Sequence, residues 1–140
     1  MNYRWTAALA PIGAALLLAG CSKGSQSASA ASGAQGYAAN CSSCHQTNGQ
    51  GAAGAFPPLD GSEIVAGDPT RMIHVVKYGL SGPVEVAGKT YNGQMPAWSP
   101  QISDANIASV ITFVRSSWGN HAAAVTAANV SAVTRAGPAK

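Results

Sequence analysis

The chain has 140 residues, enough for one domain once an N-terminal leader is set aside. Only 9% of its residues are charged and 6% are aromatic, so little large apolar bulk is available to build a core. The formal net charge of +3 is too small to indicate binding to nucleic acid or to a membrane through a basic patch.

Residues 1–20 have the features of a secretory signal peptide. A single basic residue, Arg4, precedes an apolar run rich in Ala and Leu. This run is shorter than the about 20 residues that a membrane-spanning helix needs. It ends in Leu18-Ala19-Gly20-Cys21, which resembles the cleavage box of bacterial lipoproteins, and this resemblance implies lipidation of Cys21. The alternative is an ordinary signal peptide cleaved elsewhere, which would leave Cys21 as a free thiol.

Residues 21–36 are expected to form a lipid anchor followed by a flexible linker. The tract after Cys21 contains mainly Ser, Ala, Gly and Gln and has little apolar surface to bury. We therefore place the folded domain at residues 37–119. Residues 120–140 are small and polar, and we expect them to form a C-terminal tail that wraps the surface or frays.

The main motif of the chain is Cys41-Ser42-Ser43-Cys44-His45, at the end of a helix expected over residues 37–45. Cys-x-x-Cys-His is the attachment sequence of a c-type haem. Two thiols at this spacing can each bond to a haem vinyl group, and the adjacent His is then placed as a ligand of the iron. The alternatives are a thioredoxin-like redox pair, a structural zinc site, which needs four ligands, and a simple disulfide.

Further elements are expected between this motif and residue 119. Asp68 and Pro69 begin a helix that ends at Gly79. The segments Val84-Glu85-Val86 and Lys89-Thr90-Tyr91 flank Ala87-Gly88 and predict a small hairpin. A second amphipathic helix begins after Ser103. Its apolar residues recur with the helical period at Ile107, Val110, Ile111, Val114 and Trp118.

This arrangement, over residues 37–119, resembles the class I cytochromes c. The closer resemblance is to small bacterial monohaem cytochromes c, which occur alone or as cytochrome modules of periplasmic oxidoreductases. The stretches that carry it are Phe56-Pro57-Pro58-Leu59-Asp60-Gly61-Ser62, Gly79-Leu80-Ser81-Gly82-Pro83, Tyr91-Asn92-Gly93-Gln94-Met95-Pro96 and Trp118-Gly119-Asn120. The resemblance implies an all-α fold with about three main helices around one covalent haem c, and a small hairpin before the distal Met.

The resemblance also implies an axial ligand on each side of the iron, His45 and Met95. The residues agree, because Met95 lies in a loop before Pro96, whereas Met72 is better explained as a core residue. His74, off the apolar face of its helix, is expected to face solvent or to cap.

Three further site residues follow from the resemblance. A proline carbonyl is implied as the acceptor for the His45 N–H, with Pro57 preferred and Pro58 as the alternative. Tyr91 and Trp98 could reach a haem propionate, or they could simply pack.

The sequence therefore predicts a one-electron carrier in a periplasmic or other extracytoplasmic respiratory chain, and not an enzyme. Its partners would be redox proteins and, through the lipid on Cys21, a membrane; neither nucleic acid nor a small-molecule substrate is expected. The alternative is an obligate cytochrome subunit of a membrane-associated dehydrogenase or reductase. A haem enzyme or gas-binding protein with Met95 off the iron, or a haem-free lipoprotein, are the remaining options.

Overall fold

The computed structural model describes the backbone of residues 24–136 and the side chains of residues 32–136. The expected signal peptide (residues 1–20), Cys21 and the last four residues of the expected tail lie outside this part. Three of its helices have ten or more residues: α1 (Gly24–Asn40), α4 (Pro69–Tyr78) and α5 (Asp104–Arg115). Three are shorter: α2 (Ser42–His45), α3 (Glu63–Ala66) and α6 (Ala127–Ala132).

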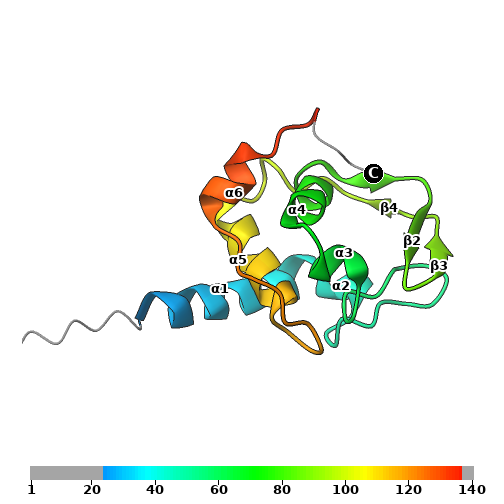
Figure 1. Ribbon diagram of the computed structural model, residues 1–140, viewed down its shortest axis with the longest axis horizontal. Helices are drawn as coiled ribbons and strands as arrows, with labels where there is room; N and C mark the ends of the chain where they lie inside the picture. Colours follow the sequence, from blue (N-terminus) through cyan, green and yellow to red (C-terminus); the bar gives the residue numbers. More distant parts are fainter. Residues whose placement is uncertain (1–23, 137–140) are drawn as a thin grey trace, which may run out of the picture.

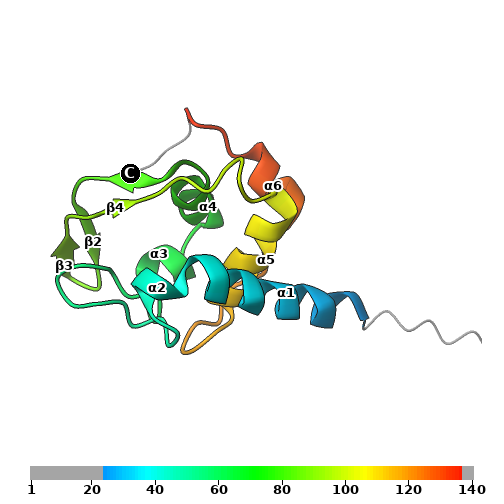
Figure 2. The ribbon, with the colours of Figure 1, turned by 180° about the vertical axis from the view of Figure 1, so that it is seen from behind.

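Two small antiparallel sheets complete the fold on the side away from the start of α1 (Figures 1 and 2). Strand β2 (Val84–Val86) pairs with β3 (Lys89–Tyr91), as the sequence predicts. Ala87 and Gly88 join them with φ of 51° and 69°, the conformation of a tight hairpin turn. The second pair was not expected: β1 (Leu80–Ser81) lies against β4 (Gln94–Met95), with Leu80 opposite Met95.

Helix α1 occupies most of the segment that was expected to form a flexible linker. The tract assigned to a linker through residue 36 is helical from Gly24 onward, and the helix ends at Asn40. Its glycines explain the difference, because they let α1 lie directly against α5. A Cβ atom on Gly33 would collide with the carbonyl oxygen of Ser109, and one on Gly36 would lie 2.6 Å from the Val110 side chain. Small residues therefore serve here as a helix-packing surface.

Helices α4 and α5 begin as the sequence predicts. The Asp68 carboxylate accepts a hydrogen bond from Thr70 N (2.8 Å), and Ser103 Oγ accepts one from Asn106 N (3.3 Å). Helix α4 ends at Gly79, as expected. Helix α5 ends at Arg115, earlier than expected, and Trp118 lies beyond it with φ of 55°.

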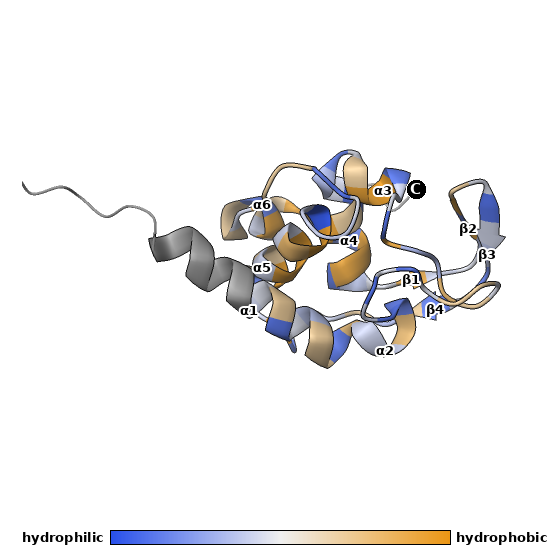
Figure 3. Ribbon diagram, turned by 90° about the horizontal axis from the view of Figure 1, so that it is seen from below, coloured by the Kyte–Doolittle hydropathy of each residue, from blue (hydrophilic) through white to orange (hydrophobic). Residues whose placement is uncertain are grey.

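The core is formed mainly by apolar side chains of α4 and α5, together with residues from α1, α3 and the segment after α5. Figure 3 shows the hydrophobic stretches in α3, α4 and α5. The buried cluster comprises Tyr37, Val65, Met72, Ile73, Ile107, Ala108, Val110, Ile111, Val114, Val125, Val130 and Val133.

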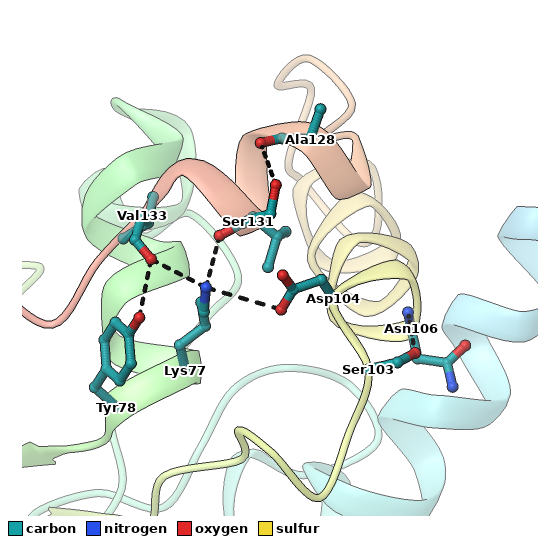
Figure 4. Close-up of polar contacts among 9 residues, drawn as sticks. Lys77, Tyr78, Ser103, Asp104, Asn106, Ala128, Ser131 and Val133 are labelled. Atoms are coloured by element: carbon teal, nitrogen blue, oxygen red, sulfur yellow. Dashed lines mark hydrogen bonds and ion pairs between the residues drawn. The ribbon is translucent and has the colours of Figure 1, made fainter.

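Residues 120–136, which we call the C-terminal strap, also differ from expectation. The strap does cross the surface of the domain, but it contains α6, and Val125, Val130 and Val133 are buried. Thr126 and Asn129 form a capping box at the start of α6. Lys77 and Tyr78 of α4 hydrogen-bond to backbone carbonyls of the strap (Figure 4). The strap is thus a packed element of the described fold.

Candidate functional site

A largely apolar cavity of about 330 Å³ is lined by residues of α2, α3, α4, α5 and the strands. Its walls contain residues from most of the chain between Tyr37 and Val114. All the cofactor-binding residues expected from the sequence line it, and they are Cys41, Cys44, His45, Pro57, Tyr91, Met95 and Trp98.

The two thiols lie on a single helical turn, with Cys41 as the N-cap residue of α2 and Cys44 within that helix. His45 N and Cys44 N both hydrogen-bond to the carbonyl of Cys41, at 2.9 and 3.2 Å. Both cysteines are half-buried free thiols. Burial, and secondarily the neighbouring Cys44, raise the pKa of Cys41 to about 11, so this thiol remains protonated at neutral pH. A zinc site would need four ligands, and no group of three His, Cys, Asp or Glu side chains gathers among residues 24–136.

His45 is positioned by Pro57 rather than by Pro58. Its Nδ1 lies 3.0 Å from the Pro57 carbonyl oxygen. Because a carbonyl can only accept, Nδ1 carries the hydrogen and Nε2 keeps its lone pair. Burial lowers the pKa of His45, while the hydrogen bond to Pro57 acts in the opposite sense. The ring, only 9% exposed, therefore favours the neutral form that a metal ligand requires.

Met95 lies on the wall of the same cavity, half-buried in β4. Gly79, with φ of 79°, ends α4 so close to this strand that a Cβ there would lie 2.7 Å from the Met95 carbonyl. Two backbone hydrogen bonds, each 3.1 Å, attach the following loop to α4: Trp98 N to Val76 O, and Ser99 N to Lys77 O. The position of Met95 is therefore set by the end of α4.

Of the other candidate ligands, Met72 shares the cavity wall, whereas the two remaining histidines lie outside it. Met72 is 7% exposed and belongs to the hydrophobic core, although it also reaches the cavity wall. His74 does not face solvent, which was one of the two expectations for it. It is 5% exposed, and its Nε2 lies 3.1 Å from the Arg135 carbonyl of the strap. Neither His74 nor the exposed His121 is among the residues that line the cavity.

Tyr91 and Trp98 reach the cavity from opposite ends of the loop that carries Met95. Tyr91 ends β3 opposite Val84 and is 5% exposed, and Trp98 is half-buried. Sequence reasoning missed one lining residue with a charge, Arg71 in the first turn of α4. Its signal in the sequence is weak, because a single arginine in a helical turn is usually exposed to solvent.

This donor set fits a haem. The cavity has predominantly apolar walls, which suit a flat apolar macrocycle, and its polar atoms include two thiols and an imidazole within five consecutive residues. A thioether from β4 lines the same space.

Comparison with known proteins identifies the family. Residues 28–114 match the family described as cytochrome c oxidase, cbb3-type, subunit III. The chain belongs to this family of c-type cytochromes. As in the family, its cofactor is a covalently bound haem c, and the cytochrome is an electron-transfer protein and not itself a catalytic enzyme. The match begins inside α1, in agreement with the early start of that helix, and ends before the C-terminal strap.

Three relatives illustrate the range of proteins that this cytochrome resembles. It is 47% identical over 94 residues to cytochrome c-552 of Thermus thermophilus, covering 64% of this chain and 70% of that protein. It is 40% identical over 101 residues to the cytochrome c subunit of the quinone alcohol dehydrogenase of Gluconacetobacter polyoxogenes, covering 70% of this chain and 21% of that subunit. The gluconate 2-dehydrogenase cytochrome c subunit of Pantoea cypripedii is 37% identical over 106 residues, covering 74% of this chain and 24% of that subunit.

The cytochrome therefore corresponds to most of one relative and to about a quarter or less of the two dehydrogenase subunits. Among residues 24–136, no helix has the length and apolar character needed to cross a membrane.

Proposed function

We propose that this cytochrome is a one-electron carrier of an extracytoplasmic respiratory chain, with His45 and Met95 as the axial ligands of its haem iron and a class I cytochrome c fold around it. The observation that carries the proposal is the placement of His45 and Met95 on the wall of one cavity, together with both thiols. The bound haem supplies an iron that accepts and releases one electron.

The residues around the cavity have separate roles in this proposal. Cys41 and Cys44 hold the cofactor through thioether bonds, so it remains attached while its oxidation state changes. The Pro57 carbonyl, 3.0 Å from Nδ1, fixes the ring of His45 and presents Nε2 to the iron. Met95 would ligate the iron from β4 and so keep water and small ligands away from it. Ligation by His and Met also raises the reduction potential.

We further propose that Cys21 carries the lipid that holds the domain at a membrane surface after residues 1–20 are removed. Support comes from the sequence Leu18-Ala19-Gly20-Cys21 alone, since these residues lie outside the described part of the chain. Several acyl chains on one residue would give a firm anchor, whereas single chains bind membranes only marginally. The domain would then exchange electrons with redox partner proteins at that surface.

A second candidate is an obligate cytochrome subunit of a dehydrogenase or reductase complex. It is favoured by the names of the relatives, two of which are cytochrome c subunits of dehydrogenases. Co-purification of the native protein after detergent extraction distinguishes the two, because a freely diffusing carrier is recovered without a stoichiometric partner.

The decisive experiment on the iron compares Met95→Ala with Met72→Leu. Both methionines reach the cavity, but only Met95 is proposed as a ligand. Met95→Ala should keep its covalent haem, lose the weak near-infrared sulfur-to-iron band, lower the reduction potential and bind cyanide or carbon monoxide readily. Met72→Leu conserves volume and should change none of these, at a cost below about 1.5 kcal/mol in stability.

Two results would contradict this assignment. If Met72→Leu opens the iron to external ligands while Met95→Ala does not, the assignment of Met95 as the ligand is wrong, but the proposal of an electron carrier still stands. If the unsubstituted protein already binds carbon monoxide rapidly at neutral pH, the carrier proposal itself fails.

A further inference from the structure

We propose that Asn120 is a positioning residue for His45. It holds the segment from Pro57 to Gly61 against the end of α5 and so keeps the Pro57 carbonyl at Nδ1 of the His45 ring. The inference rests on the proposed ligation of the iron by His45. It gives a function to Trp118-Gly119-Asn120, a stretch of the family pattern of which no residue lines the cavity.

The side chain of Asn120, the first residue of the strap, makes three hydrogen bonds to backbone groups. Its Oδ1 accepts from Gly61 N at 3.0 Å, and its Nδ2 donates to Leu59 O at 3.1 Å and to Val114 O at 2.9 Å. The residue is only 4% exposed. Because Gly61 N can only donate and the two carbonyls can only accept, a group that does both is needed here. Asn120 therefore joins the segment after Pro57 to the last turn of α5.

A second contact connects the same two parts of the chain. Asp60 Oδ1 accepts from Gly119 N at 3.0 Å, and its Oδ2 accepts from Gln50 Nε2 at 2.6 Å. The adjacent Trp118 has a φ of 55°, a conformation that a bulky residue adopts only at a cost in free energy. The turn after α5 thus accepts local strain while it delivers Gly119 and Asn120 to this segment.

The Pro57 carbonyl is confined by its neighbours on both sides along the chain. A Cβ atom on Gly51 would lie only 2.6 Å from the Pro57 oxygen, so the backbone of Gly51 packs directly against this carbonyl. Two residues after Pro57, the carbonyl of Leu59 is held by Asn120. A shift of this segment would therefore displace the Pro57 oxygen from Nδ1 of His45, which lies 3.0 Å from it.

The hydrogen bond from His45 Nδ1 to the Pro57 carbonyl acts on the proposed iron ligand. It fixes the tautomer and the orientation of the ring, and it raises the basicity of Nε2. A more basic ligand stabilises ferric iron over ferrous iron, so a secure bond lowers the reduction potential. Asn120 thereby acts on the potential from outside the cavity.

The test compares Asn120→Leu with Thr112→Val in the haem-loaded protein. Asn120→Leu keeps a similar volume and removes all three side-chain hydrogen bonds. Thr112→Val is the matched control, because it also removes bonds between α5 and the strap. These are the bonds of Thr112 Oγ1 with Val125 N (2.9 Å) and Val125 O (3.1 Å), and neither residue lines the cavity.

Each variant is measured for covalent haem staining, unfolding free energy, the near-infrared sulfur-to-iron band and the reduction potential. NMR of the ferrous form adds the rate at which the Nδ1 proton of His45 exchanges with solvent. This proton reports directly on the bond to Pro57, and a residue that merely stabilises the fold would leave its local opening unchanged.

We expect both variants to lose stability and to retain the haem stain and the sulfur-to-iron band. Only Asn120→Leu should raise the reduction potential. Only Asn120→Leu should also accelerate exchange of the Nδ1 proton, by about tenfold, which is the effect of about one net hydrogen bond on an opening equilibrium. If the potential and the exchange rate of Asn120→Leu coincide with those of Thr112→Val, Asn120 only stabilises the fold and the proposal is overturned.

A measurement on the unsubstituted protein covers the case in which Asn120→Leu does not fold. Hydrogen exchange gives the opening free energy of Gly61 N–H, which is bonded to Asn120, and that of the His45 Nδ1 proton. The two values should agree, and a Gly61 N–H that opens far more often than the Nδ1 proton would contradict the proposal. Failure of the ligand assignment is recognised separately, because the ring protons of His45 would then lack the upfield shift that an adjacent haem imposes.

Discussion

The buried ammonium of Lys77 links α4 to the C-terminal strap (Figure 4). The residue is only 6% exposed, and Nζ donates to Val130 O at 2.8 Å and to Val133 O at 3.0 Å. Asp104 Oδ1 lies 3.8 Å away and completes its surroundings. These contacts predict that Lys77→Met destabilises the domain.

The change in unfolding free energy caused by Lys77→Met can be worked out from the groups that lose or keep a partner. Methionine keeps most of the apolar stem, so little packing is lost. The two charge-assisted hydrogen bonds contribute about 1.5–3 kcal/mol each, but the substitution also removes the cost of burying a charge, which is several kcal/mol. The half-exposed ion pair with Asp104 contributes at most about 1 kcal/mol. Neither carbonyl is left without a donor, because Val133 O keeps a bond from Tyr78 OH (2.9 Å) and Val130 O keeps one from Val133 N (3.2 Å). We expect a net loss of about 2 kcal/mol, which is the part of the two lost hydrogen bonds that the recovered cost of burying the charge does not offset.

Equilibrium unfolding in guanidinium chloride, followed by circular dichroism of the haem-loaded protein, measures this loss. Lys89→Met is the control, since Lys89 is exposed on β3 and its substitution should change stability by less than about 0.5 kcal/mol. Removing residues 127–140 supplies a double-mutant cycle, in which Lys77→Met should cost little once its carbonyl partners are gone. The reasoning fails if Lys77→Met behaves like Lys89→Met, or if its effect simply adds to that of the deletion.

Three further changes test other parts of the molecule. Cys41→Ala or Cys44→Ala should largely abolish stable haem-loaded protein, because a thioether is lost; normal haem staining of the double variant would contradict the attachment assignment. Cys21→Ser should release the protein from membranes with its spectrum unchanged, and sedimentation with salt-washed membranes would show another anchor. Gly33→Leu should lower the unfolding free energy by about 1–3 kcal/mol, because it forces α1 away from α5. Gln35 is exposed on the same helix, so Gln35→Leu should leave stability nearly unchanged. Equal losses of stability in the two variants would contradict the close packing of α1 on α5 at Gly33.

Features determined by neighbouring residues could be predicted from the sequence. Asp68 and Gly79 bound α4, and Ser103 begins α5, because caps act within one helical turn. The hairpin follows from Ala87-Gly88 between two short β-rich segments. The spacing of Cys41, Cys44 and His45 likewise requires only one turn of helix. Such signals do not depend on where distant parts of the chain lie.

Features determined by distant residues could not be predicted. Gly33 and Gly36 belong to a tract whose composition is typical of linkers, and their role is visible only against Ser109 and Val110 of α5. The close packing of the strap cannot be predicted for the same reason, because its carbonyls are the partners of Lys77, some 50 residues earlier.

The candidate site likewise combines residues that local motifs predict with one residue that they do not. The candidate ligands could be named from local motifs, and the structure brings those residues to one cavity. Arg71 could not be anticipated, because neither its position on the wall nor its lack of a partner is encoded in adjacent residues.

Long-range contacts also change the charge that the molecule presents. The formal charge of +3 counts every basic residue equally. Yet Lys77 and Arg115 are 6% and 4% exposed, and Arg115 donates to the carbonyls of Val65 (2.6 Å) and Gly67 (3.0 Å). Arg71 is half-buried and faces the cavity. Three basic side chains of the described domain are therefore largely withdrawn from the surface that a partner protein meets.

The exposed charges of the described domain are consequently mostly acidic. Among residues 32–136, the basic side chains classed as exposed are Lys89 and Arg135, whereas every acid of the chain lies in this range and is exposed or half-exposed: Asp60, Glu63, Asp68, Glu85 and Asp104. This distribution does not support docking through a ring of lysines. Complementary charge accelerates association and like charge slows it, in both cases less so at high salt. Electron transfer with a basic partner should therefore slow as salt is added, and transfer with an acidic partner should accelerate, so the sign of the salt dependence discriminates between candidate donors and acceptors.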